Sequence, residues 1–258
     1  MGKNRTHLSW ENREQDLKKM KRYGNFSVMF YRSNLHLHSQ RVGALLERII
    51  PLAKKLYPDL DIKKARLIAK HHDDYELRPE IGDVPLQLKL MMNDQELSHL
   101  EKKEIWAAEA MAQFYPKKVG GYNYLQLLLH AIHKDCIEAQ LVSVADKNDG
   151  CCEAIHEVLA GNTIFLEPII NYHAKTFSNF SSKYPLVEKI FSSDHSLLSV
   201  PVVDLKLFFA NGNRGAEPHT LQTIIRKTDI PRYEEWKRTT IKNFGMDPLI
   251  RQTEFHNA

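Results

Sequence analysis

Apolar residues recur at helical spacing through most of the first 195 residues of the chain. From His38 onward, Val42, Leu45 and Ile49 follow the i, i+4, i+7 rhythm of a helix with one buried face, and Pro51 is expected to disturb it. Residues 62–72 repeat the pattern after an acidic stretch that can cap a helix. These periodicities predict a bundle of amphipathic helices.

The same pattern predicts the other elements and the breaks between them. Glycines or prolines mark breaks at Gly24, in the loop 80–85 and at Gly120 with Gly121. Further helices are expected over residues 10–21, 94–115, 122–133, 135–159 and 163–183. The sequence therefore predicts an all-α domain over residues 1–195.

After residue 196 the pattern changes. Apolar and polar residues alternate between Val203 and Phe209, which favours a strand or a short amphipathic segment. Residues 196–258 are therefore expected to form a C-terminal extension. Its role could be a packing extension, a contact in a homodimer or a partner-binding surface.

The bulk composition excludes several classes of protein. The chain has 258 residues, of which 43% are hydrophobic and 26% charged, as in a soluble globular protein. A net charge of +4 does not argue for nucleic acid as a partner, but it suits an anionic small substrate. Three cysteines, two of them adjacent, make a poor disulfide framework and indicate a cytoplasmic location. No apolar run reaches membrane-spanning length.

The strongest chemical signal is the adjacent pair His72 and Asp73. An imidazole and a carboxylate suit a divalent metal, and His38 upstream and Asp146 downstream could complete four ligands. A lone histidine on an apolar face is usually a core residue, and a lone aspartate is often a helix cap. Here three predicted helices each turn an ionisable residue toward apolar neighbours, and a cation would remove the cost of burying the carboxylates. The set therefore favours a metal site.

Three local stretches carry a resemblance to a known family. They are His-Ser-Gln-Arg-Val at 38–42, His-Asp-Asp-Tyr-Glu at 72–76 followed by Gly-Asp-Val-Pro at 82–85, and Ala-Asp-Lys at 145–147. In their order and context they resemble the HD-domain superfamily of metal-dependent phosphohydrolases. Within it, they are most similar to the bacterial 5′-deoxynucleotidases. The resemblance implies an HD-domain helical bundle.

The resemblance also implies a role for each matching residue. His38, His72, Asp73 and Asp146 would ligate one divalent metal. Two positions of an octahedral ion would remain for water and phosphate, so Mn, Co, Fe or Mg is expected rather than Zn.

Three further residues receive roles from the same resemblance. Glu76 would position or protonate the substrate at the scissile bond. Asp83 would lie over the site, near the sugar hydroxyl or the attacking water. Arg22 resembles an upstream phosphate-binding arginine, whose guanidinium fits phosphate well. Its ordinary alternative is a solvated charge at a helix end.

The chain departs from the family pattern in two places. The stretch between Glu76 and Asp83 is longer than usual, and the acidic residue shortly before the final aspartate has no counterpart. His130 and His133 stand near that place instead, one helical turn apart. They are candidates for a second metal site, against the ordinary alternative of a polar edge on a packing helix.

The expected activity is hydrolysis of (deoxy)nucleoside 5′-monophosphates by metal-activated water. Three alternatives stay open. The same scaffold could hydrolyse nucleoside triphosphates, cyclic nucleotides or guanosine tetraphosphate. Recruitment of the extra histidines would suit a di-iron oxygenase, and the chain could also be a regulatory module without activity.

Overall fold

A computed structural model of the chain shows a helical protein. It describes residues 8–24, 26, 29, 32–159, 162–172 and 180–189. Within this part the secondary structure is helical apart from one two-stranded sheet, which confirms the predicted all-α fold. The predicted extension 196–258, including the alternating segment 203–209, lies outside the described residues.

The helices follow one another through short connections. In chain order they are α1 (Arg13–Lys19), α2 (Leu35–Leu56), α3 (Ile62–His71), the 3₁₀ turn η1 (Asp74–Leu77), α4 (Leu86–Met91), α5 (Asp94–Ala112), α6 (Tyr124–His133), α7 (Ile137–Leu159), η2 (Thr163–Phe165), α8 (Leu166–Tyr172) and α9 (Phe180–Lys183). Strands β1 (Lys118–Val119) and β2 (Tyr122–Asn123) form an antiparallel hairpin before α6.

Four of these helices begin at a side chain that caps their first turn. Asn34, Asp61, Asn93 and Asn123 each accept a hydrogen bond from a backbone N–H three residues later. Such caps satisfy amide groups that the helix itself leaves unpaired. The cap at Asp61 confirms the acidic start expected for the third helix.

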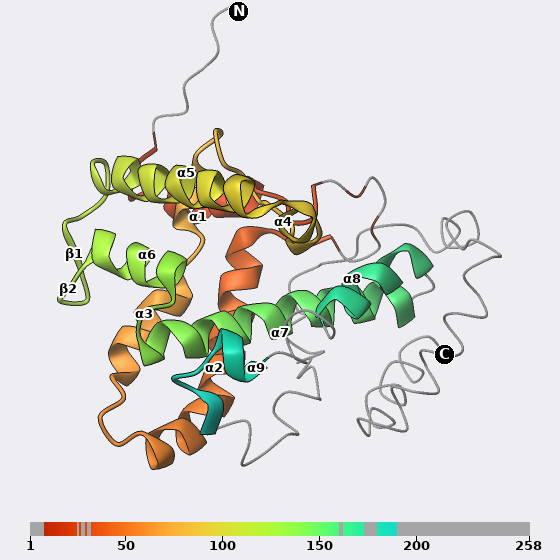
Figure 1. Ribbon diagram of the computed structural model, residues 1–258. Helices are drawn as coiled ribbons and strands as arrows, with labels where there is room; N and C mark the ends of the chain where they lie inside the picture. The colour runs from red at the N-terminus through yellow and green to blue at the C-terminus, as the bar shows by residue number, and fades with distance from the viewer. Residues whose placement is uncertain are drawn as a thin grey trace, which may run out of the picture.

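The long helices α2 and α7 cross at the centre of the protein, and α3 packs against both (Figure 1). Apolar side chains from these three helices form one core cluster. A second cluster joins α1, η1, α5 and α6 above it. The C-terminal end of α3 therefore lies between the two clusters, and the chain turns there from His71 into η1.

Two helix boundaries differ from the sequence prediction. Helix α2 continues through Pro51 to Leu56, although a proline removes one helical hydrogen bond. Burial of Ile49, Ile50 and Ala53 in the core holds this turn in place. Helix α3 ends at His71, so His72 is its C-cap and Asp73 lies beyond it.

Two other predicted helices are interrupted. Residues 122 and 123 belong to the hairpin rather than to α6, because Gly120 and Gly121 adopt positive φ angles of 59° and 96° that turn the chain back on itself. The predicted helix 163–183 is divided into η2, α8 and α9. Local periodicity does not reveal either interruption.

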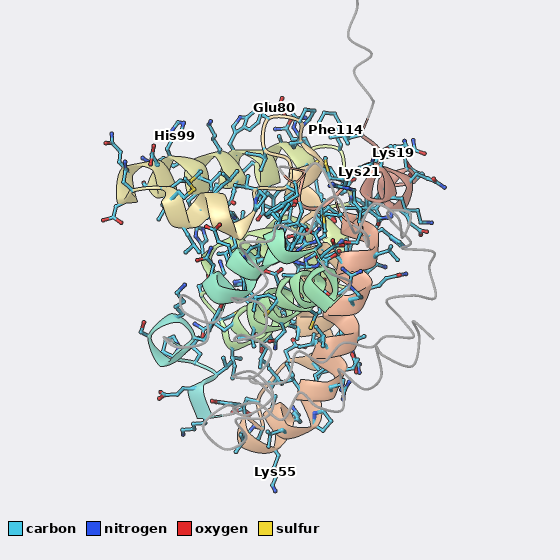
Figure 2. All side chains as sticks on the ribbon, turned by 90° about the vertical axis from the view of Figure 1, so that its right-hand side faces the viewer. Lys19, Lys21, Lys55, Glu80, His99 and Phe114 are labelled. Carbon is cyan, nitrogen blue, oxygen red and sulfur yellow. The ribbon has the colours of Figure 1, made fainter. Side chains whose placement is uncertain are left out.

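Both ends of the molecule carry exposed side chains. Figure 2 shows Lys55 projecting at the far end of α2, with Glu80 and Phe114 at the opposite end of the molecule. None of the helices in the described part of the chain combines the length and apolar composition needed to span a bilayer.

Candidate metal centre

The structure brings the four predicted ligands together from three helices. His38 comes from α2, His72 and Asp73 from the end of α3, and Asp146 from the middle of α7. Nε2 of His38 lies 3.2 Å from a carboxylate oxygen of Asp73 and 3.2 Å from one of Asp146. Nε2 of His72 lies 3.3 Å from Asp73 and 3.2 Å from Nε2 of His38. The four side chains therefore point at one small volume.

The Nδ1 atoms of His38 and His72 each contact a hydrogen-bond acceptor. Nδ1 of His72 donates to the backbone carbonyl of Ala69 at 2.9 Å, and Nδ1 of His38 lies 2.7 Å from the carboxylate of Asp149. These contacts fix the ring orientation and leave both Nε2 atoms for a ligand at the centre.

The spacing and chemistry of the four groups fit a divalent cation. An ion about 2.1 Å from each ligand atom separates neighbouring ligand atoms by about 3 Å, close to the observed contacts. Two imidazole nitrogens and two carboxylates suit borderline and hard metals. His38 is fully buried, and His72 and Asp73 are 6% and 8% exposed, so a cation would also offset the buried negative charge.

A proton and a metal would compete for this centre. Burial opposes a charge on His38, but its bonds to Asp146, Asp149 and Asp73 raise its pKa well above the ordinary value. Burial also opposes the charge on Asp73, while His72 and His38 lower the pKa of that carboxyl to about 2. Metal binding at this centre is therefore expected to weaken as the pH falls.

Glu76 follows the ligand pair on η1 and lines the cavity beside the centre. Burial and the negative charges of Asp73 and Asp83 raise the pKa of its carboxyl well above the usual range. Its Oε2 atom is buried and has no hydrogen-bond partner among the described residues. A carboxyl with a raised pKa next to the centre is better suited to donate a proton than an ordinary glutamate.

Asp83 and Arg22 also lie in the wall of this cavity. Asp83 accepts a hydrogen bond from the backbone N–H of Tyr23 at 2.7 Å, which ties its loop to the segment before α2. Burial raises the pKa of Asp83. Arg22 is 4.0 Å from Asp73, but its Nε donates to Glu153 at 2.8 Å. Much of the guanidinium charge is therefore already paired.

Comparison with known proteins identifies the family of this chain. The model of the 5′-deoxynucleotidase YfbR-like family matches residues 13–188. The chain belongs to this family. The match includes every predicted site residue and ends before the predicted extension. No curated protein matches the chain significantly.

Two solved structures are similar in fold to this YfbR-like chain, and one of them is an HD-domain protein. An HD-domain phosphohydrolase from Listeria innocua is 17% identical, with a TM-score of 0.53 over 89% of this chain and 97% of that one. A conserved hypothetical protein from Pyrococcus furiosus is 23% identical, with a TM-score of 0.51 over 73% of this chain and 96% of that one.

A buried ionic network that the sequence pattern did not predict lies behind the centre of this YfbR-like chain. Arg41 donates to Asp149 at 2.6 Å and to Glu153 at 2.5 Å, and Asp149 in turn holds His38. Helical spacing places its members near the centre but does not pair them. Arg41 follows His38 by three residues, and Asp149 follows Asp146 by three, so each pair shares a helix face.

Replacing Asp149 with asparagine is expected to lower the metal affinity by about 10- to 100-fold, because the amide no longer supports His38 with a charge. The Mn²⁺ dissociation constant of the chelator-treated protein, measured by calorimetry, checks this. Asp59→Asn is the matched control, since Asp59 is exposed. An unchanged dissociation constant in Asp149→Asn would show that His38 needs no such support.

Three lysines to which the sequence assigned no role also line the cavity. Lys89 pairs with Glu104 at 2.8 Å, and Lys147 contacts the adjacent Asp146 at 2.5 Å. Lys134 lines the same cavity from the end of α6. Lys89 follows the Gly-Asp-Val-Pro motif by four residues and Lys134 lies between the second and third motifs, but nothing in their local pattern signals a site.

The two histidines proposed for a second metal have separate partners. Nδ1 of His130 lies 2.6 Å from Asp135, and Nδ1 of His133 lies 3.1 Å from Glu101. His130, Asp135 and Cys136 do present ligand atoms within 4.8 Å of one another, but His133 is not in that group. A second metal held by both histidines stays a prediction that these contacts do not favour.

Proposed function

We propose that this chain is a metal-dependent phosphomonoesterase that hydrolyses nucleoside 5′-monophosphates, deoxynucleotides among them, to nucleoside and phosphate. One observation supports it most. Two histidine Nε2 atoms and two carboxylates converge beside a cavity into which Glu76 presents a carboxyl with a raised pKa. Membership of the YfbR-like family supports the nucleotide as substrate.

His38, His72, Asp73 and Asp146 would hold the divalent ion. Bound there, the ion supplies a water of lowered pKa and neutralises charge on the phosphoryl oxygens. Two nitrogen and two oxygen ligands leave positions open on a six-coordinate ion, so we expect Mn, Co, Fe or Mg rather than Zn.

Three residues around the centre would protonate the leaving group, orient the water or sugar, and orient the phosphate. Glu76 would donate its proton to the leaving 5′ oxygen, because burial and the charges of Asp73 and Asp83 raise its pKa and so favour the protonated carboxyl. Asp83 would accept a hydrogen bond from the sugar or orient the attacking water, from the wall of the cavity. Arg22 would orient phosphate while it stays paired with Glu153.

A substrate panel tests the proposal. The full chain, loaded with Mn²⁺, Co²⁺ or Mg²⁺ in turn, is incubated with nucleoside mono-, di-, tri- and cyclic phosphates. We expect inorganic phosphate from the 5′-monophosphates. His72→Ala should be inactive, whereas His99→Ala, at an exposed histidine on α5, should match the wild type. Pyrophosphate or tripolyphosphate as the main product would instead indicate a triphosphohydrolase or guanosine tetraphosphate hydrolase.

A further inference from the structure

Lys134 has an unusual place at the end of α6. It is the C-cap residue, with φ 54° and ψ 38°, and its N–H donates to the carbonyl of His130 at 2.8 Å. Glycine normally takes this left-handed conformation, which a residue with a Cβ atom adopts at a cost. From this position Lys134 lines the same cavity as Asp146 and Glu76.

The charge of Lys134 is less compensated than that of the other cations in the cavity wall. Lys89, Lys147 and Arg22 each form an ion pair with a carboxylate. Among the described residues, no carboxylate oxygen lies within ion-pair distance of Lys134, and its ammonium donates to the carbonyl of Ile132 at 3.2 Å. An ammonium has three N–H donors, so two remain for another acceptor.

The neighbours of Lys134 make this position favourable for an anion. Burial and the positive charges of Lys147 and Lys89 lower the pKa of Lys134 to about 8. Glu104 and Asp146 raise the pKa of Lys134 in turn, but they are paired with Lys89 and Lys147 and neither lies within ion-pair distance of Lys134. Inorganic phosphate and phosphate monoesters carry two negative charges near neutral pH, and they offer several acceptor oxygens.

We propose that Lys134 binds a non-bridging oxygen of the substrate's phosphoryl group, and of the phosphate product, from the wall of the cavity. The proposal rests on the phosphomonoesterase function above and adds a specificity-determining residue to it. A monoester dianion brings two negative charges to Lys134, whereas a phosphodiester brings one. The cavity should therefore favour terminal phosphate monoesters over cyclic nucleotides.

Substitutions that suit the left-handed backbone test the role of Lys134 without disturbing the fold. Lys134→Asn and Lys134→Gly remove the charge at a conformation that both residues accept. Lys134→Arg keeps the charge, and Lys118→Asn is the matched control at an exposed lysine of β1. Each full-length variant is loaded with Mn²⁺. We then measure the phosphate dissociation constant by calorimetry, KM and kcat for dAMP, metal content and Tm.

Loss of a charged hydrogen bond should raise the phosphate dissociation constant and KM by about tenfold or more in Lys134→Asn and Lys134→Gly. Metal content should not change, and Tm should stay level or rise. Lys134→Arg should retain most of the affinity. Unchanged phosphate affinity and KM in both neutral variants, or no phosphate binding by the wild type, would overturn the proposal.

The phosphate measurement also separates this proposal from the proposed function. If the wild type binds phosphate through Lys134 but releases none from any monoester, the function fails and the anion site stands. If the neutral variants hydrolyse dAMP with the wild-type KM, the function stands and the role of Lys134 is wrong.

Discussion

Replacing Asp73 with alanine is expected to abolish both metal binding and phosphatase activity, with kcat/KM falling by about a thousandfold or more. Asp73 contacts His38 and His72 through the same oxygen, Oδ2, at 3.2 and 3.3 Å. Its loss would leave the two Nε2 atoms facing each other across 3.2 Å with one fewer negative charge between them. A divalent ion would then lose its central anionic ligand.

The variant is compared with Asp59→Ala, which removes an exposed aspartate from the connection between α2 and α3. After dialysis against chelator and reloading with Mn²⁺, metal content and phosphate release from dAMP are measured on folded protein, with circular dichroism as the check on folding. Wild-type activity in Asp73→Ala would show that the metal centre has been assigned to the wrong residues.

Glu76→Gln is expected to lower kcat for dAMP by about 10²- to 10⁴-fold while metal content stays at the wild-type value. Glutamine preserves the size of the side chain but has no proton to give to the leaving oxygen. Glu109→Gln, on the exposed face of α5, is the matched control. A kcat within a few-fold of the wild type would remove Glu76 from the chemistry.

The pH dependence gives this prediction a second readout. Burial, then Asp73 and Asp83, raise the pKa of Glu76, so the carboxyl is the active proton donor below that pKa. Wild-type kcat should therefore fall as the pH rises through it, and this limb should be missing in Glu76→Gln.

The same shift predicts a change in stability. A carboxyl whose pKa is higher in the folded state destabilises the fold once the pH exceeds its unfolded pKa of about 4.3. The metal-free Glu76→Gln protein should therefore have a Tm at neutral pH equal to or above that of the metal-free wild type.

The sequence predicted the parts of the fold that depend on local periodicity. The apolar faces of α2, α3 and α7 were visible in the pattern, and so were the residues that turn toward the centre. Continuation of α2 through Pro51 was not, because tertiary burial of Ile49 and Ala53 decides it. The hairpin before α6 was not predicted either, because Gly120 and Gly121 indicated only a break between helices and not the two short strands beside them.

The site residues that the sequence did not predict are likewise brought together by tertiary packing rather than by a local pattern. The partners Arg41 and Asp149 lie more than a hundred residues apart in the sequence, and no local pattern joins them. Lys134 occupies a left-handed position where glycine is usual, so sequence rules indicate a helix end there but not a cavity. Family resemblance selected Arg22, whose pairing with Glu153 only the structure shows.

The most direct test of the central claim is a metal titration of the full chain. Chelator-treated protein is titrated with Mn²⁺ while phosphate release from dAMP is followed. We predict no activity without metal, and a rise that saturates at one ion per chain in the wild type and is absent in Asp73→Ala. Hydrolysis of dAMP that persists in the metal-free protein, or a rise that is unchanged in Asp73→Ala, would contradict a metal centre built from His38, His72, Asp73 and Asp146.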